Sequence, residues 1–167
     1  MPYCYRWLDT PIGRLLLVAD ESGLRQVSFA AGRTPPVVAP DWRNGGEPLD
    51  EPSRQLEAYF AGERKQFDLL LNPEGTPFQL HVWNTLLEIP FGETISYGEL
   101  ARRLGNPKAS RAVGLANGTN PIPIIIPCHR VIGSNGRLTG YGGGLETKRR
   151  LLEFERNQIP FEFPDSR

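Results

Sequence analysis

The sequence predicts an α/β protein of the α+β type, with a small β-rich N-terminal domain and a helical C-terminal domain that carries a helix-turn-helix. Alternating and β-rich apolar runs gather in the first half, whereas apolar residues at helical spacing and helix-capping residues dominate the second. The segment "PEGT", residues 73–76, separates the two patterns. We therefore expect domains over residues 1–75 and 76–157, followed by a tail over residues 158–167.

The N-terminal domain is predicted to contain a hairpin, a helix and a further strand. The hairpin lies in "PIGRLLLVADESGLRQVSFA", where two β-rich runs are joined by the turn-like "DESG". The helix lies in "DEPSRQLEAYFAGE", with acidic residues and Pro52 at its start and Gly62 at its end. In "KQFDLLLN" the apolar residues alternate, which predicts a strand with one buried face.

The C-terminal domain is predicted to begin with a helix. Thr76 is its expected N-cap and Pro77 its first residue. Helical spacing predicts a buried face that consists of Phe78, Val82, Leu86 and Leu87.

Two short helices are expected next. In "ISYGELARRLG", Ser96 and Glu99 have the spacing of a capping box and Gly105 is the expected end of the helix. "NPKASRAVGLANG" then restarts a helix near Asn106. Two helices joined by a tight Gly-Asn-Pro turn have the outline of a helix-turn-helix, which a plain helical hairpin shares.

Composition and charge limit the class of protein. The 167 residues are 39% apolar and 23% charged, which is typical of a globular chain. Apolar runs are too short for a bilayer, and the N-terminus lacks the features of a signal peptide, so we expect an intracellular, cytoplasmic protein. Residues 1–75 carry a net charge of −3 and residues 76–167 a net charge of +3. A polyanion would therefore bind the C-terminal half.

The segment "NPIPIIIPCHRVIG" places one of two cysteines directly before one of two histidines. A free thiol is mostly protonated at neutral pH, and a neighbouring histidine and cations are the usual means of lowering its pKa. Cys128 is therefore a candidate nucleophile, with His129 and Arg130 beside it. In a regular strand, side chains 128 and 129 would point to opposite faces, so their pairing needs a bend or a bridging water. A buried structural cysteine is the alternative.

Read together, these motifs resemble the O6-alkylguanine-DNA alkyltransferases, or methylated-DNA-protein-cysteine methyltransferases. The resemblance spans roughly residues 76–157 and rests on "FGETISYGELARRLGNPKASRAVG", "PCHRVIG", "GYGGG" and "KRRLLEFE", with weaker matches in "TPIGRLLLVAD" and "LEAYFAGE". It implies DNA repair by direct reversal: the alkyl group of O6-alkylguanine moves irreversibly to cysteine, with O4-alkylthymine as a further candidate substrate. Each molecule would act once and need no cofactor.

The resemblance assigns the reaction to particular residues. Cys128 matches the nucleophile, and His129 matches the base that removes the thiol proton through a water molecule. Glu155 matches the acid that orients the histidine; Glu153 is the competing acid, because helical spacing alone does not separate them. Tyr97 matches the phenol that donates a hydrogen bond to the base ring.

Further matches concern the pocket. Asn120 matches the amide that braces the active-site turn. The carbonyls of Cys128 and Val131 would accept from the exocyclic amine of guanine, and the backbone N–H of Gly142 would face O6. Tyr141 belongs to the loop that walls the pocket. This loop reads "GYGGG", so the serine hydroxyl found in one common family variant is absent.

The resemblance also implies a DNA-binding mode. The second helix of the helix-turn-helix would enter the minor groove of double-stranded DNA, and Arg111 matches the residue that fills the space of the flipped-out base. We expect the protein to act as a monomer. The other residues of this helix that we expect at the DNA are Ala112, Ala116, Asn117 and Gly118.

Other functions fit parts of the pattern. A Cys-His hydrolase would turn over, and a helix-turn-helix regulator would leave Cys128 structural. Related proteins that recognise the lesion without repairing it have tryptophan at the position of Cys128, which disfavours that variant. Some relatives bind zinc in the N-terminal domain, but Cys4 and His81 are the only candidate ligands outside the active site. We therefore expect no metal.

Overall fold

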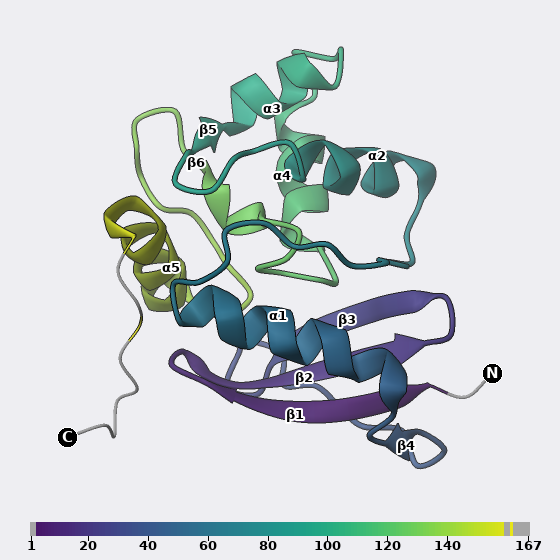
Figure 1. Ribbon diagram of the computed structural model, residues 1–167. Helices are drawn as coiled ribbons and strands as arrows, with labels where there is room; N and C mark the ends of the chain where they lie inside the picture. The colour runs from purple at the N-terminus through teal and green to yellow at the C-terminus, as the bar shows by residue number, and fades with distance from the viewer. Residues whose placement is uncertain (1–2, 159–160, 162–167) are drawn as a thin grey trace. The chain divides into compact units, whose positions relative to one another are not determined.

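The computed structural model describes residues 3–158 and residue 161. The chain divides into two compact units with a boundary between Pro73 and Glu74, and Gln158 and Phe161 belong with the first unit. The expected tail, 158–167, lies outside the described residues apart from these two. Each unit combines strands and helices (Figure 1), which confirms the predicted fold class. Within the described ranges, no helix has the length and apolar content that a membrane span requires.

The first unit contains a four-stranded sheet with the order β3-β2-β1-β4. Strands β1 and β3 pair antiparallel with the central strand β2, and β4 pairs parallel with β1. The β2–β3 hairpin is the predicted one, whereas the sequence pattern did not indicate β1. The strands are β1 (Cys4–Thr10), β2 (Gly13–Asp20), β3 (Gly23–Phe29) and β4 (Arg43–Asn44).

Helix α1 (Asp50–Phe60) lies against this sheet (Figure 1). It follows a 3-10 turn, η1 (Glu47–Leu49), and buries an apolar stripe that includes Leu56 and Tyr59. The helix ends just before Gly62, whose φ of 78° is a left-handed conformation that glycine adopts without a steric penalty. Both the helix and its end confirm the prediction.

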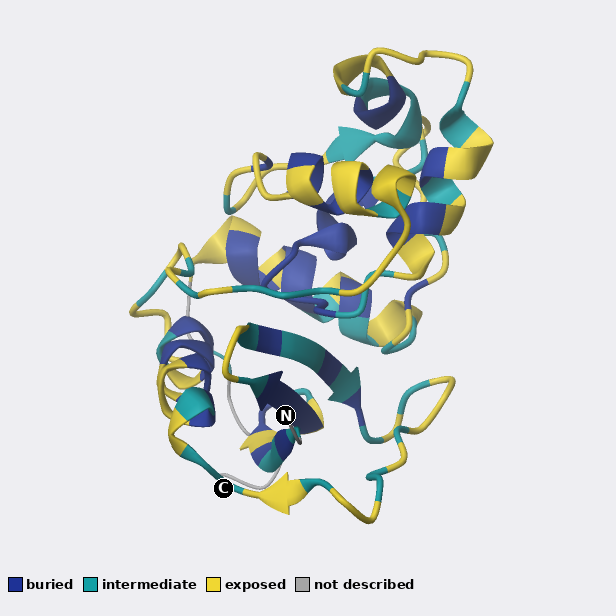
Figure 2. Ribbon diagram, turned by 90° about the vertical axis from the view of Figure 1, so that its right-hand side faces the viewer, coloured by how far each residue is buried: buried dark blue, intermediate teal, exposed yellow. Residues whose placement is uncertain are grey.

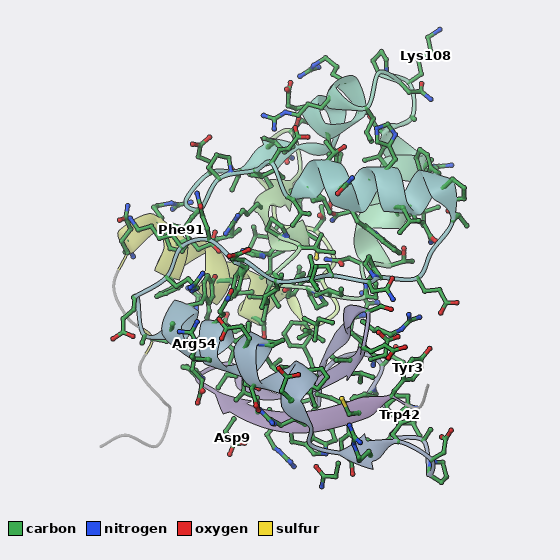
Figure 3. All side chains as sticks on the ribbon, turned by 45° about the vertical axis from the view of Figure 1, so that its right-hand side comes forward. Tyr3, Asp9, Trp42, Arg54, Phe91 and Lys108 are labelled. Carbon is green, nitrogen blue, oxygen red and sulfur yellow. The ribbon has the colours of Figure 1, made fainter. Side chains whose placement is uncertain are left out.

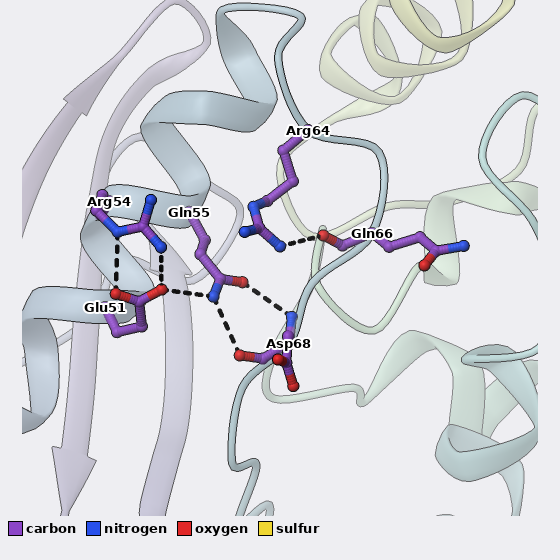
Figure 4. Close-up of polar contacts among 6 residues, drawn as sticks. All are labelled: Glu51, Arg54, Gln55, Arg64, Gln66 and Asp68. Atoms are coloured by element: carbon purple, nitrogen blue, oxygen red, sulfur yellow. Dashed lines mark hydrogen bonds and ion pairs between the residues drawn. The ribbon is translucent and has the colours of Figure 1, made fainter.

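The segment predicted as a strand, residues 65–72, forms only one bridge to β3. The N–H of Leu24 donates to the Leu70 carbonyl (2.9 Å), and the N–H of Asn72 donates to the Leu24 carbonyl (2.8 Å). Elsewhere a side chain replaces the neighbouring strand: the Gln55 amide donates to the Asp68 carbonyl (3.0 Å) and accepts from the Asp68 N–H (2.9 Å; Figure 4). The prediction of a strand is therefore wrong, because alternation records partial burial and not ladder pairing.

The second unit begins with helix α2 (Pro77–Leu86), whose start confirms the prediction. The Thr76 hydroxyl accepts from the Gln79 N–H (3.1 Å), and the Gln79 side-chain oxygen accepts from the Thr76 N–H (2.9 Å), so the capping box is complete. The predicted buried face is only half right. Val82 and Leu86 are buried together with Trp83, whereas Phe78 and Leu87 are 39% and 45% exposed.

Helices α3 (Tyr97–Arg103) and α4 (Ser110–Gly118) form the helix-turn-helix. The Ser96 hydroxyl caps α3 by accepting from the Glu99 N–H (3.0 Å). The Glu99 carboxylate binds Arg102 and Arg103 instead of returning to the cap. The chain leaves α3 at Gly105, where φ is 80°, as the sequence predicted.

The second helix of this motif starts later than predicted. It begins at Ser110 and not near Asn106, because residues 106–109 form a turn in which the Ala109 N–H donates to the Asn106 carbonyl (3.0 Å). Lys108 projects from this turn (Figure 3). The turn therefore carries an exposed positive charge in front of α4.

A short parallel pair of strands brings distant parts of the second unit together. Strand β5 (Ile95–Ser96) pairs with β6 (Val131–Ile132), with Ile95 opposite Val131. The 3-10 turn η2 (Cys128–Arg130) directly precedes β6, and α3 directly follows β5. This pairing therefore places the start of α3 beside the Cys-His-Arg segment. Helix α5 (Leu145–Asn157) completes the unit.

Candidate active site

Cys128 lies in a buried, irregular turn. Residues 122–130 are buried throughout (Figure 2). The Cys128 N–H donates to the Ile126 carbonyl at 2.7 Å across Pro127, whose φ of −81° and ψ of 63° are those of an inverse γ-turn. Cys128 and His129 then enter η2. The geometric objection to their cooperation does not arise, because the segment is not a regular strand.

Asn120 holds this turn from both ends. Its amide nitrogen donates to the Ile126 carbonyl (2.8 Å), and its amide oxygen accepts from the Ile122 N–H (2.9 Å). Between these two points Ile124 has a φ of 75°, which is sterically unfavourable for a β-branched residue. The Asn120 bonds thus fix a strained loop directly before the cysteine, which is the geometry expected of a bracing residue.

The His129 imidazole is paired with Glu155 in the interior of the unit. Nε2 of His129 lies 2.8 Å from Oε2 of Glu155, and the two side chains are 0% and 1% exposed. The other ring nitrogen, Nδ1, is buried and has no hydrogen-bond partner among the described residues. If Nε2 carries the proton toward the carboxylate, Nδ1 is left as a proton acceptor.

Arg130 was expected to act on the Cys128 thiol, but its guanidinium binds Glu155. Its Nε and Nη2 donate to the two oxygens of Glu155 at 2.8 and 2.9 Å, and Nη1 donates to the Ile89 carbonyl at 2.7 Å. The idea that this cation lowers the pKa of Cys128 is therefore wrong, because its charge is committed to the carboxylate. Glu153 is 52% exposed and pairs with Arg149 (2.7 Å), so Glu155 is the acid at His129.

Burial is the largest single influence on the pKa values of Cys128, His129 and Glu155, although it does not decide the outcome for Glu155. It raises the pKa of Cys128 to about 11, against opposing effects of the Asn120 amide and the Lys148 ammonium. Burial also lowers the pKa of His129, although Glu155 acts in the opposite direction. For Glu155, burial opposes ionisation, but His129 and Arg130 outweigh it and lower its pKa. At neutral pH the set is a thiol, a neutral imidazole and a carboxylate.

Two residues that the sequence motifs did not assign lie in the same site. The Tyr97 hydroxyl shares a hydrogen bond with the Thr139 hydroxyl. The buried Lys148 ammonium donates to the carbonyls of Val131 (2.8 Å) and Thr139 (3.3 Å). Helical spacing was a usable signal for Lys148, because it shares a face with the buried Leu151, Leu152 and Glu155. No sequence pattern pointed to Thr139.

Two further predicted residues border the cysteine. Tyr141 is buried, and its ring meets the His129 ring edge to face, with centroids 6.4 Å apart; burial raises the pKa of its hydroxyl. The Asn117 amide donates to the Cys128 carbonyl at 3.4 Å from within α4. Gly142 is exposed in the loop that follows Tyr141.

The residues of α4 that we expected at DNA divide into two sets. Ala116 and Asn117 are each 4% exposed, and the Ala116 carbonyl accepts from the Trp83 indole N–H (2.8 Å). They face the interior of the unit because α4 packs on α2 with this side. The exposed set consists of Arg111, Ala112 and Gly118, together with Leu115.

Cys4 and Cys128 are free thiols. Among the described residues, no group of three or more histidine, cysteine or acidic side chains is arranged to hold a metal ion.

Comparisons with known proteins identify relatives of both units. Residues 77–157 match the family model described as the DNA binding domain of 6-O-methylguanine DNA methyltransferase, and residues 3–73 match its ribonuclease-like domain. A methylated-DNA–protein-cysteine methyltransferase of Methanosarcina acetivorans is 59% identical, over 90% of this chain and 97% of the relative. One of Mycobacterium tuberculosis is 51% identical, over 93% and 94% of the two chains.

Solved structures show the same relationship. The crystal structure of M. tuberculosis OGT in complex with DNA superposes with a TM-score of 0.86 at 50% identity, covering 93% of this chain and 94% of that one. The O6-methylguanine-DNA methyltransferase of Pyrococcus kodakaraensis gives a TM-score of 0.68 at 25% identity, over 92% and 98%. Because family models cover both units and relatives are more than half identical, the chain belongs to the methylated-DNA–protein-cysteine methyltransferase family.

Proposed function

We propose that this protein repairs DNA by moving the alkyl group of O6-alkylguanine onto Sγ of Cys128, once per molecule. The observation that carries the proposal is the buried pair of His129 and Glu155 directly beside a buried cysteine, in a unit that matches a DNA-binding family model. The sulfur–carbon bond forms as the carbon–O6 bond breaks. The cysteine is the acceptor, so the reaction consumes the site and requires no cofactor.

The proton of the thiol must leave during the transfer. Because the pKa of Cys128 is about 11, little thiolate exists in the free protein at neutral pH. His129 is neutral and offers Nδ1, so it accepts the proton through a bridging water, while Glu155 stays ionised and stabilises the imidazolium that results. Arg130 keeps the carboxylate in place with two hydrogen bonds. The relay therefore creates the nucleophile only as the alkyl carbon is attacked.

The departing guanine carries negative charge that the site has to stabilise. Tyr97 donates to the base ring, and the backbone N–H of Gly142 faces O6. The carbonyls of Cys128 and Val131 accept from the exocyclic amine. The Val131 carbonyl also accepts from Lys148, and the Cys128 carbonyl accepts from the Val131 N–H and, at 3.4 Å, from the Asn117 amide. At Cys128 the amine therefore shares the oxygen with two protein donors, because a carbonyl oxygen has two lone pairs.

DNA is the partner that the family relationship supports. We propose that α4 enters the minor groove with its exposed face and that Arg111 replaces the flipped-out nucleotide. Ala116 and Asn117 then act from the inner side of the helix, and not as contacts on its surface. A monomeric state and a cytoplasmic location remain predictions, as does reaction with O4-alkylthymine.

The experiment that tests this function is mass spectrometry of the intact protein and its peptides after incubation with a duplex that contains O6-methylguanine. We expect one methyl group per protein, on the Cys128 peptide. Cys128→Ala should gain nothing, whereas Cys4→Ala, which changes the other buried thiol, should gain the methyl group like the wild type. An unchanged mass with an intact lesion would overturn the proposal, and repeated turnover would favour a hydrolase.

Arg111→Ala is expected to slow methyl transfer from duplex DNA at least about tenfold, because nothing then offsets the cost of unpairing and unstacking the base. Reaction with free O6-methylguanine, which needs no flipping, should change little. The measurement is the single-turnover rate constant on both substrates. Arg149→Ala removes a surface charge on α5 and is the matched control. Equal losses on both substrates would contradict a role in flipping.

A further inference from the structure

Tyr97 is held at the site by three neighbours. It is the first residue of α3 and follows β5, whose pairing with β6 sets its position relative to Cys128. On one side its ring lies against Gly114 of α4, where an added methyl group would be 3.7 Å from two ring carbons. On the other side its hydroxyl is bonded to the Thr139 hydroxyl. The phenol oxygen therefore has a fixed partner before any substrate binds.

Thr139 is itself anchored from α5. The buried Lys148 ammonium donates to the Thr139 carbonyl at 3.3 Å and to the Val131 carbonyl at 2.8 Å. One cation thus joins the loop that carries Thr139 to β6, which is paired with the strand preceding Tyr97. The position of the Thr139 hydroxyl is therefore set by the same elements that position the phenol.

The direction of this hydrogen bond has a chemical consequence. A hydroxyl has one proton to donate and two lone pairs that accept. If Tyr97 gives its proton to the guanine ring, as the proposed function requires, it has no second proton for Thr139. The Thr139 hydroxyl must then donate to the phenol oxygen, which fixes the torsion of the Tyr97 proton and makes it a better donor.

We propose that Thr139 is a positioning residue for alkyl transfer: its hydroxyl donates to Tyr97 and directs the phenol proton to the departing base. This inference rests on the proposed function and deepens it. In the proposed reaction Thr139 touches neither Cys128 nor the alkyl group, so its effect passes through Tyr97. If Thr139 acts in this way, a substitution at position 139 changes the rate of transfer, and the amount of alkyl group finally accepted stays the same.

The test is a double-mutant cycle on the single-turnover rate of methyl transfer from an O6-methylguanine duplex. Thr139→Val keeps the shape of the side chain and removes its hydroxyl, and we expect a loss of about fivefold, the effect of one hydrogen bond. Thr139→Ser restores the hydroxyl and should react within about twofold of the wild type. In a Tyr97→Phe background, Thr139→Val should have no further effect.

The outcomes separate this inference from the proposed function. If the wild type accepts no methyl group, the proposed function fails and the inference fails with it. If the wild type reacts but Thr139→Val matches it, the inference alone is overturned. A Thr139→Val loss that is equally large in the Tyr97→Phe background also overturns it, since a loop distorted by the substitution would act without the phenol. Failure of Thr139→Ser to recover the rate leads to the same conclusion.

Discussion

Glu155→Gln is expected to lower the free energy of unfolding by about 3 to 5 kcal/mol, because it leaves the buried Arg130 guanidinium without its counter-ion. It should also slow alkyl transfer strongly, since His129 loses the carboxylate that orients it and stabilises its protonated form. Urea unfolding and the single-turnover rate measure the two effects.

Glu153, which lies in α5 like Glu155, provides the control. Glu153 is 52% exposed and pairs with Arg149 at the surface, so Glu153→Gln should cost no more than about 1 kcal/mol and leave the rate unchanged. Equal destabilisation by the two substitutions would contradict the assignment of Glu155 as the buried acid.

The loss of unfolding free energy caused by Glu155→Gln should depend on pH. The pKa of Glu155 is lower in the folded protein than in the unfolded chain, because the effects of His129 and Arg130 exceed that of burial. The stability that its carboxylate contributes is therefore present above the ordinary carboxyl pKa of about 4 and is lost as the pH falls toward the folded value. The difference between wild type and Glu155→Gln should shrink in acid.

Cys128 is expected to titrate far above an ordinary thiol. Burial raises its pKa from 9.0 to about 11, so the folded protein disfavours the thiolate. A group with a raised pKa contributes its full stability below the unfolded value and loses it as the pH rises through the folded one. By pH 11 the wild type should have lost about 2 kcal/mol more than Cys128→Ala, which cannot ionise there.

Two measurements check this second prediction. Unfolding free energies of the wild type and Cys128→Ala, compared from pH 8 to pH 11, isolate the contribution of this thiol from other groups that titrate in alkali. The difference in thiolate absorbance between the two proteins should have its midpoint near the raised pKa. A midpoint close to 9, the value of an ordinary thiol, would show that burial does not disfavour the thiolate and would contradict this prediction.

Both predictions bear on how the reaction is controlled. A thiol that is protonated in the free protein reacts slowly with small electrophiles, because the thiolate is the nucleophile. In the proposed reaction, the relay of His129 and Glu155 makes deprotonation coincide with a bound alkyl carbon. A protein that acts once per molecule thereby avoids consuming its only acceptor on an unrelated reagent.

The sequence determined those features whose signals lie within a few residues. Thr76 with Gln79, Ser96 with Glu99, and the ends at Gly62 and Gly105 are local hydrogen-bonding or backbone requirements, and the helices they delimit are present in the structure. The Cys-His-Arg segment with its flanking motifs likewise indicated the family without reference to tertiary contacts.

Other local signals were ambiguous for an identifiable reason. Alternation in residues 65–72 recorded which side chains are partly buried, but the partner of the Asp68 backbone is the Gln55 side chain of α1. The sequence suggested a helix start near Asn106, yet α4 begins at Ser110. Neither the partner of an extended segment nor the point where a turn gives way to a helix is encoded in its own residues.

The tertiary structure alone decided the chemistry of the site. Only folding brings α5 against η2, and this contact selects Glu155 over Glu153 and gives the Arg130 charge to Glu155 in place of Cys128. Only the β5–β6 pairing and the Lys148 anchor bring Thr139 to Tyr97. The pKa of Cys128 follows burial, a property of the whole unit, and not its neighbours in sequence. Residues adjacent in the chain predict which groups can react, whereas desolvation and pairing between distant segments decide their charges.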